Sequence, residues 1–360
     1  MKTDRAVKCD HMTALAEYRD NVLRREPKLK FLFLELTDRC NERCRHCGSS
    51  CGDGADADLL TDDEIKTFLK KTASQFDIGN LQLCVTGGEP LLRRGFFEIM
   101  DYARSLGYRW GMTSNATLIT KEVAHRLAEV GMGTISVSID GLPETHDKLR
   151  GTPGGYELAM RGIRNLIDEK AFRAIQVTTV VNHENIGELD ELFAIMDGLD
   201  IDSWRVINLE PIGRALDWPS RMLTKEDYLR LFRFIREKRQ QGYPVQYGCS
   251  HYLGPEWERE TRDWYWLCNA GVYTASIMAN GDVGACLDIE RRPETIQGNI
   301  RESRFKDLWD NRFALFRRDL SEGSAFCVGC EHAGHCRGDA HPSWDYDKNE
   351  PMLCFKNLLF

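Results

Sequence analysis

The sequence predicts an α/β protein in which a parallel sheet is followed by a smaller cysteine-rich region. Six short apolar runs, many of them β-branched, alternate with amphipathic segments over residues 30–215. Repeated strand–helix units form a parallel sheet, open or curled into a partial barrel, with functional loops at the carboxyl ends of the strands. The predicted strands are Phe31–Leu36, Leu81–Val85, Trp110–Thr113, Thr134–Ile139, Ile175–Val181 and Trp204–Asn208.

Helix signals occupy the segments between these runs. Thr61 and Glu64 have the spacing of a capping box, in which each side chain bonds to the backbone N–H of the other residue. Apolar residues recur on one helical face behind this cap, which predicts an amphipathic helix packed on the sheet. Further helices are predicted near residues 11–25, within an N-terminal segment 1–29, and over Lys121–Glu129, Tyr156–Glu169 and Ile186–Met196.

The strand–helix rhythm ends near residue 215. A charged amphipathic helix is predicted over Thr224–Gln240, within a linker of residues 216–245. Residues 246–360 contain many glycines, cysteines and aromatic side chains but few long apolar runs, so metal ligation is the expected source of their order. The elements predicted there are a hairpin of Ala275–Met278 and Val283–Cys286 with a type I′ turn at Asn280-Gly281-Asp282, and a helix over Phe305–Phe316.

Composition and charge exclude several classes of function. The 360 residues include 48 basic and 56 acidic side chains, and the net charge of −8 argues against binding to nucleic acid or to anionic membranes. No run approaches the roughly 18 apolar residues of a membrane span. The first residues lack the apolar core of a secretory signal, so we expect a cytoplasmic protein.

The 13 cysteines are the unusual feature of the composition. An odd number of cysteines without an export signal argues against a disulfide framework and leaves metal ligation or buried structural thiols. Most of them fall into one group near residue 45 and another from residue 249 onward, which indicates two metal-bearing regions. Cys9, Cys51 and Cys84 are expected to be ordinary thiols.

The first group is Cys40, Cys44 and Cys47, with the spacing C-x3-C-x2-C directly after the first predicted strand. Three thiolates on one loop can bind three irons of a cubane cluster and leave its fourth iron open. Cys51 is close enough in sequence to be a fourth ligand, so a closed site with four cysteines is the alternative.

A glycine turn follows the second predicted strand as Gly87-Gly88-Glu89-Pro90. Two glycines at the end of a strand allow a ligand to approach the backbone closely. Glu89 supplies an acceptor for an ammonium group. The turn and the cysteine loop follow neighbouring strands of a parallel sheet, so both are expected on the same side of it.

These two motifs, in this order and strand context, resemble the CxxxCxxC and GGEP motifs of the radical SAM superfamily. The resemblance implies a partial (β/α)6 barrel over residues 30–215 and a [4Fe–4S] cluster whose open iron is chelated by the amino and carboxylate groups of S-adenosylmethionine. It also implies reductive cleavage of that cofactor to methionine and a 5′-deoxyadenosyl radical, which abstracts hydrogen from a substrate.

The resemblance also implies cofactor-binding residues at the strand ends. The glycine turn would bind the amino group, and the end of the sixth strand, Leu209–Arg214, would cradle adenine. Arg150 looks like the arginine that pairs with the methionine carboxylate, a role that suits its planar fork of donors. The polar residues expected to contact ribose and the methionine carboxylate are Ser114, Asn115, Ser136, Ser138 and Asp140.

The second cysteine group resembles the SPASM extension of radical SAM proteins, a small α+β SPASM/twitch region that binds auxiliary iron–sulfur clusters. A zinc ribbon is the alternative, because Cys327-Val328-Gly329-Cys330 also looks like a zinc knuckle. By resemblance, an outer cluster would be held by Cys327, Cys330, Cys336 and Cys354.

An inner auxiliary cluster is less fully specified. The family pattern has a cysteine where this chain has Ala340, which leaves only Cys249, Cys268 and Cys286 as thiol ligands. Three alternatives follow. A side chain near Ala340 could bind the fourth iron, the fourth iron could remain open, or the cluster could be absent. The side chains considered as a fourth ligand are Asp339, His335 and His341.

Enzymes with this extension mostly modify peptides or proteins, so the sequence predicts a peptide or protein maturase. Only 30 residues precede the first strand, too few for a leader-binding module, so a separate leader-recognition protein or direct recognition is expected. A flavodoxin or ferredoxin would supply electrons. The alternatives are a radical SAM enzyme acting on a small molecule, such as a tetrapyrrole or sugar alcohol, and a non-catalytic iron–sulfur or zinc protein.

Two further expectations concern the substrate side of the site. The aromatic residues Trp257, Trp264, Tyr265 and Trp266 are candidates for its entrance. Asp288 follows Cys286 by two residues and would point away from the site if the predicted strand continued through it, because side chains alternate between the faces of a strand.

Overall fold

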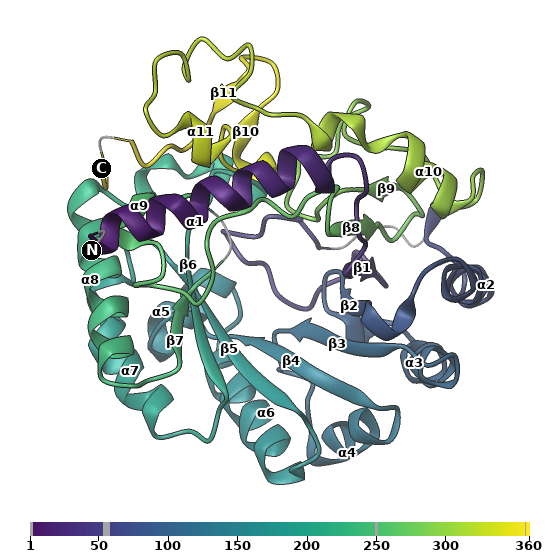
Figure 1. The fold of residues 1–360 in the computed structure, drawn as a ribbon. Helices are drawn as coiled ribbons and strands as arrows, with labels where there is room; N and C mark the ends of the chain where they lie inside the picture. The colour runs from purple at the N-terminus through teal and green to yellow at the C-terminus, as the bar shows by residue number, and fades with distance from the viewer. Residues whose placement is uncertain (1–2, 53–57, 249–250, 357) are drawn as a thin grey trace.

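A single curled sheet of nine strands organises the computed structural model, which describes residues 3–52, 58–248, 251–356 and 358–360. The strand order is β7-β6-β5-β4-β3-β2-β1-β8-β9, and helices surround the outer face of the curled sheet (Figure 1). The strands are β1 (Phe31–Glu35), β2 (Gln82–Thr86), β3 (Arg109–Ser114), β4 (Met132–Ser138), β5 (Ala174–Val181), β6 (Ser203–Asn208), β7 (Val245–Tyr247), β8 (Thr274–Ile277) and β9 (Val283–Gly284).

The six predicted strands are all present, and they pair in parallel in the order of the chain. Two strands that the sequence did not predict to join them lengthen the sheet at both edges. β7, at the end of the predicted linker, pairs in parallel with β6, and β8, from the cysteine-rich region, pairs in parallel with β1. The partial barrel is therefore confirmed, and part of the cysteine-rich region continues its sheet.

The helices of the barrel follow the predicted strand–helix rhythm. The Thr61–Glu64 capping box is formed, and Thr224 and Asp227 form a second one at the start of the linker helix. Within the described residues, no helix is both long and apolar enough to cross a membrane. The helices are α2 (Asp62–Gln75), α3 (Phe96–Ser105), α4 (Lys121–Glu129), α5 (Pro143–Arg150), α6 (Gly155–Glu169), α7 (Leu189–Asp197) and α8 (Lys225–Gln240), with single 3-10 turns η3 (Ile78–Asn80), η4 (Pro90–Leu92), η5 (Ile186–Glu188), η6 (Gly213–Asp217) and η7 (Pro219–Arg221).

Side chains alternate between the two faces of the barrel strands, with one register shift between β3 and β4. The residues facing the helices are large and fully buried, as Leu83, Val137 and Trp204 show. Many of the residues facing the inside of the barrel, which we call the lumen, are partly exposed, as Cys84 and Ser136 show. The hydrophobic core therefore lies between sheet and helices, and the lumen is left for other use.

The region after β7 has little regular structure. The N-terminal helix packs against it, through ion pairs of Lys8 with Glu260 at 2.6 Å and of Arg337 with Asp20 at 2.6 Å (purple and yellow in Figure 1). The remaining elements are α1 (Asp4–Tyr18), which continues as a π-helical turn η1 (Arg19–Leu23), α9 (Gly254–Trp257), α10 (Phe305–Asn311), η8 (Phe313–Arg317), α11 (Ala333–Cys336), η9 (His341–Ser343), β10 (Trp344–Asp345) and β11 (Glu350–Pro351).

The predicted hairpin is present as β8 and β9, but its turn is not of type I′. That type requires a positive φ at both central residues. In this loop Gly281 has a φ of 93°, whereas Asn280 does not have a positive φ. The strands close through the bond from Met278 N–H to the carbonyl of Asp282 at 2.8 Å, which leaves a three-residue loop.

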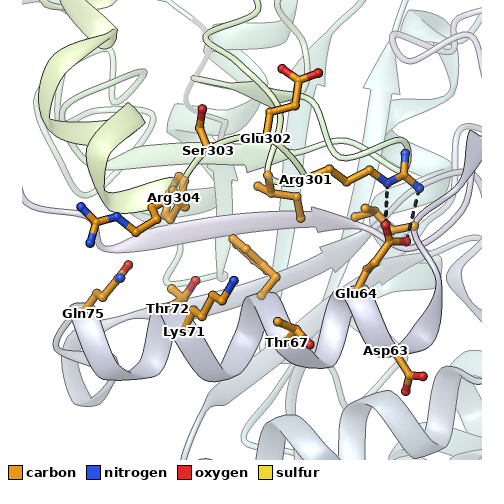
Figure 2. A pocket seen from close by; sticks show the side chains of 14 residues that line it. Asp63, Glu64, Thr67, Lys71, Thr72, Gln75, Arg301, Glu302, Ser303 and Arg304 are labelled. Atoms are coloured by element: carbon orange, nitrogen blue, oxygen red, sulfur yellow. Dashed lines mark hydrogen bonds and ion pairs between the residues drawn. The ribbon is translucent and has the colours of Figure 1, made fainter.

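The cysteine-rich region also contacts α2 (Figure 2). Arg301 forms an ion pair with Glu64 at 2.6 Å, and Glu64 completes the capping box that begins at Thr61, the N-cap residue of α2. Beside this pair, the Phe305 ring packs against Phe68 and Phe76, with centroids 5.7 and 5.3 Å apart. The two regions are thus joined at α2 by an apolar contact with an exposed ion pair at its edge.

Candidate active site

One cavity of about 280 Å³ opens at the carboxyl ends of the barrel strands. Both predicted motifs reach it, together with polar residues from the ends of β3 and β4. Thr86, Thr113, Ser138, Val180 and Ile207 are the last lumen-facing residues of their strands and form part of its wall. The predicted site residues on the wall are Cys40, Cys44, Cys47, Gly87, Gly88, Ser114, Asn115, Ser138 and Arg150, whereas Glu89, Pro90, Ser136 and Asp140 lie behind it.

Backbone contacts hold the cysteine loop in place. Arg214 donates from Nε to the carbonyl of Cys44 and from Nη1 to the carbonyl of Cys51, both at 2.7 Å. A Cβ on Gly213 would lie 2.4 Å from the carbonyl oxygen of Cys47, so only glycine fits there. The segment predicted to cradle adenine therefore also fixes the loop, a role that the sequence did not reveal.

The glycine turn packs against the cysteine loop, and its predicted role in binding the cofactor stays a prediction. The N–H of Gly88 donates to the carbonyl of Thr37 at 2.8 Å, and that of Glu89 donates to the carbonyl of Arg39 at 2.8 Å. A Cβ on Gly87 would lie 2.2 Å from the carbonyl oxygen of Thr37, and one on Gly88 would lie 2.0 Å from that of Arg39. The two glycines are needed because the turn packs directly against the cysteine loop.

Glu89 is fully buried beneath the glycine turn. Its carboxylate accepts bonds from the Ser114 hydroxyl at 3.0 Å and from the Asn115 N–H at 2.9 Å. Burial raises the pKa of Glu89 to about 7. Glu89 thus fixes the turn after β3 whose residues reach the cavity, and its predicted contact with an ammonium group stays a prediction.

A buried ion network lies on the other side of the cysteine loop. Arg150 donates from Nε to Asp140 at 2.8 Å and from Nη1 to Glu42 at 2.9 Å. His46 Nε2 lies 3.0 Å from the same Asp140 carboxylate. Burial opposes ionisation of Asp140, but the charges of Arg150 and His46 hold its pKa well below the usual range. Glu42 and His46 were not predicted, although both lie within the cysteine motif.

Arg150 therefore already has two carboxylate partners within the protein. Ser136 likewise already has a partner within the protein, because its hydroxyl lies 2.8 Å from that of Thr178. Both residues stay predictions as cofactor ligands.

The thiols of the loop differ in their surroundings. Burial raises the pKa of Cys40 and of Cys44, whereas a hydrogen bond from Cys51 lowers the pKa of Cys47 to about 5. Three soft sulfur donors beside one cavity fit an iron–sulfur cluster. Cys51 lines the same cavity, so the geometry leaves the four-cysteine alternative open.

One acidic residue after the β8–β9 hairpin lies on the cavity wall, where it was not predicted. β9 ends at Gly284 and the chain turns after Cys286, which brings Asp288 onto the wall and corrects the expectation that it points away. The side chain of Asp288 is exposed to solvent within the cavity, but desolvation by the surrounding protein raises its pKa, and the nearby carboxylate of Glu210 adds to the rise.

The predicted outer-cluster cysteines lie near one another. Burial raises the pKa of Cys336. Negative charge on nearby groups raises it further, and these groups are Asp339, Cys354, Cys327 and Cys330. This proximity fits a shared cluster, although it does not by itself exclude zinc.

For the inner cluster, Cys268 and Cys286 are described, and Cys249 lies outside the described residues. The three side chains considered as its fourth ligand are all engaged elsewhere. His341 lies between the Tyr346 hydroxyl and the carbonyl of Phe316, and His335 bonds to Thr13 at 2.9 Å.

The third of them, Asp339, belongs to a buried chain of polar groups. His251 is fully buried, with Nδ1 2.5 Å from Asp339 and Nε2 2.7 Å from Glu210. Burial alone would lower the pKa of His251, but the two carboxylates raise it to about 10. This chain connects the cavity wall with the segment that follows Cys336.

The predicted entrance aromatics do not reach the cavity. Trp257 and Trp266 are buried in the core. Trp264 and Tyr265 lie along α1, where the Tyr265 hydroxyl is 3.2 Å from His11. Packing on the N-terminal helix therefore accounts for the exposed pair, and this expectation is wrong.

A partial parallel barrel with a cysteine loop, a glycine turn and polar strand ends around one cavity defines an enzyme that uses an iron–sulfur cluster and S-adenosylmethionine. The family model of the radical SAM superfamily matches residues 34–195, and that of the SPASM iron–sulfur cluster-binding domain matches residues 268–331. The chain belongs to the radical SAM superfamily and carries a SPASM domain.

Its relatives have different named activities. The AdoMet-dependent heme synthase of Methanosarcina barkeri is 32% identical over 89% of this chain and 95% of its own length. The mycofactocin maturase MftC of Mycobacterium tuberculosis is 31% identical over 84% of this chain and 76% of its own length. Among solved structures, anSMEcpe with bound AdoMet has the same fold, with a TM-score of 0.72 and 20% identity over 91% of this chain and 94% of that one.

Proposed function

We propose that Cys40, Cys44 and Cys47 hold a [4Fe–4S] cluster and that the adjoining cavity binds S-adenosylmethionine. When bound, these groups supply one-electron cleavage of the sulfonium and a 5′-deoxyadenosyl radical that abstracts hydrogen from the substrate. The observation that carries the proposal is the convergence of the three cysteines, the glycine turn and the polar ends of β3 and β4 on one cavity.

The chain's own residues orient the cofactors and limit their motion. Arg214 and the backbone of α5 hold the cysteine loop, the latter through the carbonyls of Leu149 and Arg150. Glu89 orients Ser114 and Asn115 toward the cavity. Such support matters because a reacting group displaced by about 1 Å loses much of its rate.

Formation of 5′-deoxyadenosine tests this proposal. The anaerobically reconstituted protein is incubated with a reductant and S-adenosylmethionine, and the products are separated by chromatography with mass detection. We expect product from the wild type and from Cys51→Ala, and none from Cys44→Ala. Absence of product from the wild type alongside retained iron would favour the closed four-cysteine site instead.

The proposed substrate is a peptide or protein, which makes the chain a maturase. The support is the 31% identity to a protein named as a maturase over 84% of this chain. A flavodoxin or ferredoxin would supply the electron, and a separate leader-recognition protein would deliver the peptide within the cytoplasm.

A tetrapyrrole is the second candidate substrate. The relative named as a heme synthase matches this chain over 95% of its own length, so the match includes nearly all of that relative. The test compares 5′-deoxyadenosine formation with iron-coproporphyrin III and with a peptide encoded beside the gene. A peptide of changed mass supports the maturase, and a converted porphyrin supports the second candidate.

For the SPASM region we propose an outer cluster at Cys327, Cys330, Cys336 and Cys354, and an inner cluster at Cys249, Cys268 and Cys286 with an open iron. The support is that Asp339, His335 and His341 all have other partners. Three cubanes require about 12 iron atoms per chain. A count near 8 that does not fall further in Cys268→Ala would contradict the inner cluster.

A further inference from the structure

Many of the side chains that line the barrel lumen midway along β4, β5 and β6 are polar. Closed parallel barrels fill this space with layers of bulky branched residues. Here, the lumen-facing residues beneath the cavity are partly exposed or hydroxyl-bearing, so the space is not a packed core. They include Cys84, Ser136, Gln176, Thr178 and Ser203.

Arg205 carries the positive charge at this level of the lumen. It is the third residue of β6 and lies in register with Thr178 of β5. Its Nε donates to the Thr178 hydroxyl at 3.1 Å, and that hydroxyl lies 2.8 Å from the hydroxyl of Ser136. The neighbouring strand β5 therefore holds the guanidinium through one donor, and β4 supports that contact through Ser136.

The other donors of Arg205 are not used. Among the described residues, its Nη groups donate to no partner, and no carboxylate forms an ion pair with it. Arg150 and Arg214, on the cavity wall, differ because carboxylates or carbonyls occupy their guanidinium groups. Asp288 interacts with this charge only at a distance beyond an ion pair, and a half-buried cation without a direct ion pair is costly, which favours a site that a ligand completes.

Arg205 lies directly beneath the cofactor cavity. Ile207, two residues further along the same face of β6, forms part of the cavity wall. Two residues of a strand span about 6.6 Å. The charge of Arg205 also opposes the rise that burial causes in the pKa of Asp288, which lies on the same wall. A ligand on the Nη groups would therefore extend from the lumen into the cavity.

We propose that Arg205 binds a carboxylate of the substrate, so that this enzyme acts on a carboxylate-bearing compound held in the barrel lumen. The proposal rests on the proposed radical SAM function. Two free Nη groups in one plane match the two oxygens of a carboxylate, which gives strong and oriented hydrogen bonds. A peptide would present its C-terminus or an acidic side chain, and a tetrapyrrole would present an acidic substituent.

The methionine part of S-adenosylmethionine is the other possible source of a carboxylate. Its carboxylate must reach the open iron at the cysteine loop, which follows β1. Arg205 lies on β6 and below the cavity wall. We therefore assign the Arg205 partner to the substrate, and the experiment separates the two sources.

The test uses trifluoroacetate as a carboxylate probe, followed by the width of its ¹⁹F NMR line. Oxidised holoenzyme is measured with S-adenosylmethionine present, so that no turnover occurs. We expect Arg205→Gln to weaken probe binding about tenfold, Arg205→Lys to weaken it less, and both to retain S-adenosylmethionine affinity within about twofold. Arg164→Gln, which removes an exposed arginine of α6, is the matched control and should behave as the wild type.

Three results would overturn the proposal. Probe binding could be unchanged in Arg205→Gln. S-adenosylmethionine could displace the probe and bind more weakly to Arg205→Gln, which would assign the arginine to the cofactor. Iron could be lost from both Arg205 variants, which would make the residue structural. Failure of the wild type to form 5′-deoxyadenosine would instead overturn the proposed function, because probe binding requires no catalysis.

Discussion

The barrel site and the SPASM region differ in what positions their predicted cluster ligands. In the barrel, the three cysteines lie on one loop, and the residues around them come from the ends of regularly paired parallel strands. In the SPASM region, β10 and β11 have two residues each, and buried polar groups connect segments far apart in the chain. The Asp339–His251 bond, for example, spans 88 residues. Sheet topology therefore positions the first site, and specific buried contacts position the second.

The largest expected effect is the loss of 5′-deoxyadenosine formation, which should depend on the barrel cluster and not on the outer cluster of the SPASM region. Cys47→Ala should lower 5′-deoxyadenosine formation at least about 100-fold, because it removes a ligand of the radical-generating cluster. Cys336→Ala should lose about four iron atoms per chain yet still cleave S-adenosylmethionine. Product assays and iron analysis on the same samples check both results. Equal loss of cleavage in the two variants would show that the regions do not act separately.

The next effect concerns the stability of the SPASM region. Arg262 and Glu258 form a fully buried ion pair, and Arg262 also donates to the carbonyls of Gly248 and His251. Arg262→Ala should destabilise the protein by about 3–5 kcal/mol, because it leaves the Glu258 charge buried without a partner. The midpoint of denaturant unfolding measures the change. Arg164→Ala, which removes an exposed side chain of α6, is the control. A shift no larger than that of the control would mean that this region does not depend on its buried pair.

A smaller effect is expected from the buried polar groups Glu210, His251 and Asp339, which connect the two regions. Asp339→Ala removes the acceptor of His251 Nδ1 and of the Tyr252 N–H, and leaving these donors unsatisfied should cost about 1–3 kcal/mol. Asp347→Ala is the control, since Asp347 is exposed and pairs only at the surface. Unfolding midpoints and iron content of both variants are compared. An equal loss in the two would contradict the role given to the buried chain.

The smallest effect is expected at the joint with α2 (Figure 2). Arg301→Ala should change the free energy of unfolding by less than about 1 kcal/mol, because its pair with Glu64 is exposed. The remaining effect should shrink further in high salt. A large, salt-sensitive loss would show that surface charge, rather than the Phe305 contact, holds the SPASM region on the barrel.

Much of the barrel site could be predicted because its signals are local. The cysteine loop and the glycine turn are contiguous in sequence, and the parallel sheet brings the ends of neighbouring strands together. The role of Arg214 could not be predicted, because its acceptors are backbone carbonyls 163 and 170 residues away. The lumen position of Arg205 follows from strand alternation, but its unused donors are visible only in three dimensions.

The SPASM region was less predictable for a physical reason. β7 has three residues, too few for alternation to identify a strand. β8 was predicted as a hairpin strand, but its four residues do not reveal its parallel pairing with β1. Asp288 was misplaced because β9 ends two residues before Cys286. The engagement of Asp339 by His251 depends on contacts that no local pattern encodes.

Binding of S-adenosylmethionine to the cluster of the barrel loop can be observed by low-temperature EPR of the reduced protein, with and without the cofactor. We expect a change in one cluster signal on addition of the cofactor, present in the wild type and in Cys336→Ala and absent from Cys44→Ala. A change that persists in Cys44→Ala but disappears in Cys336→Ala would contradict this binding.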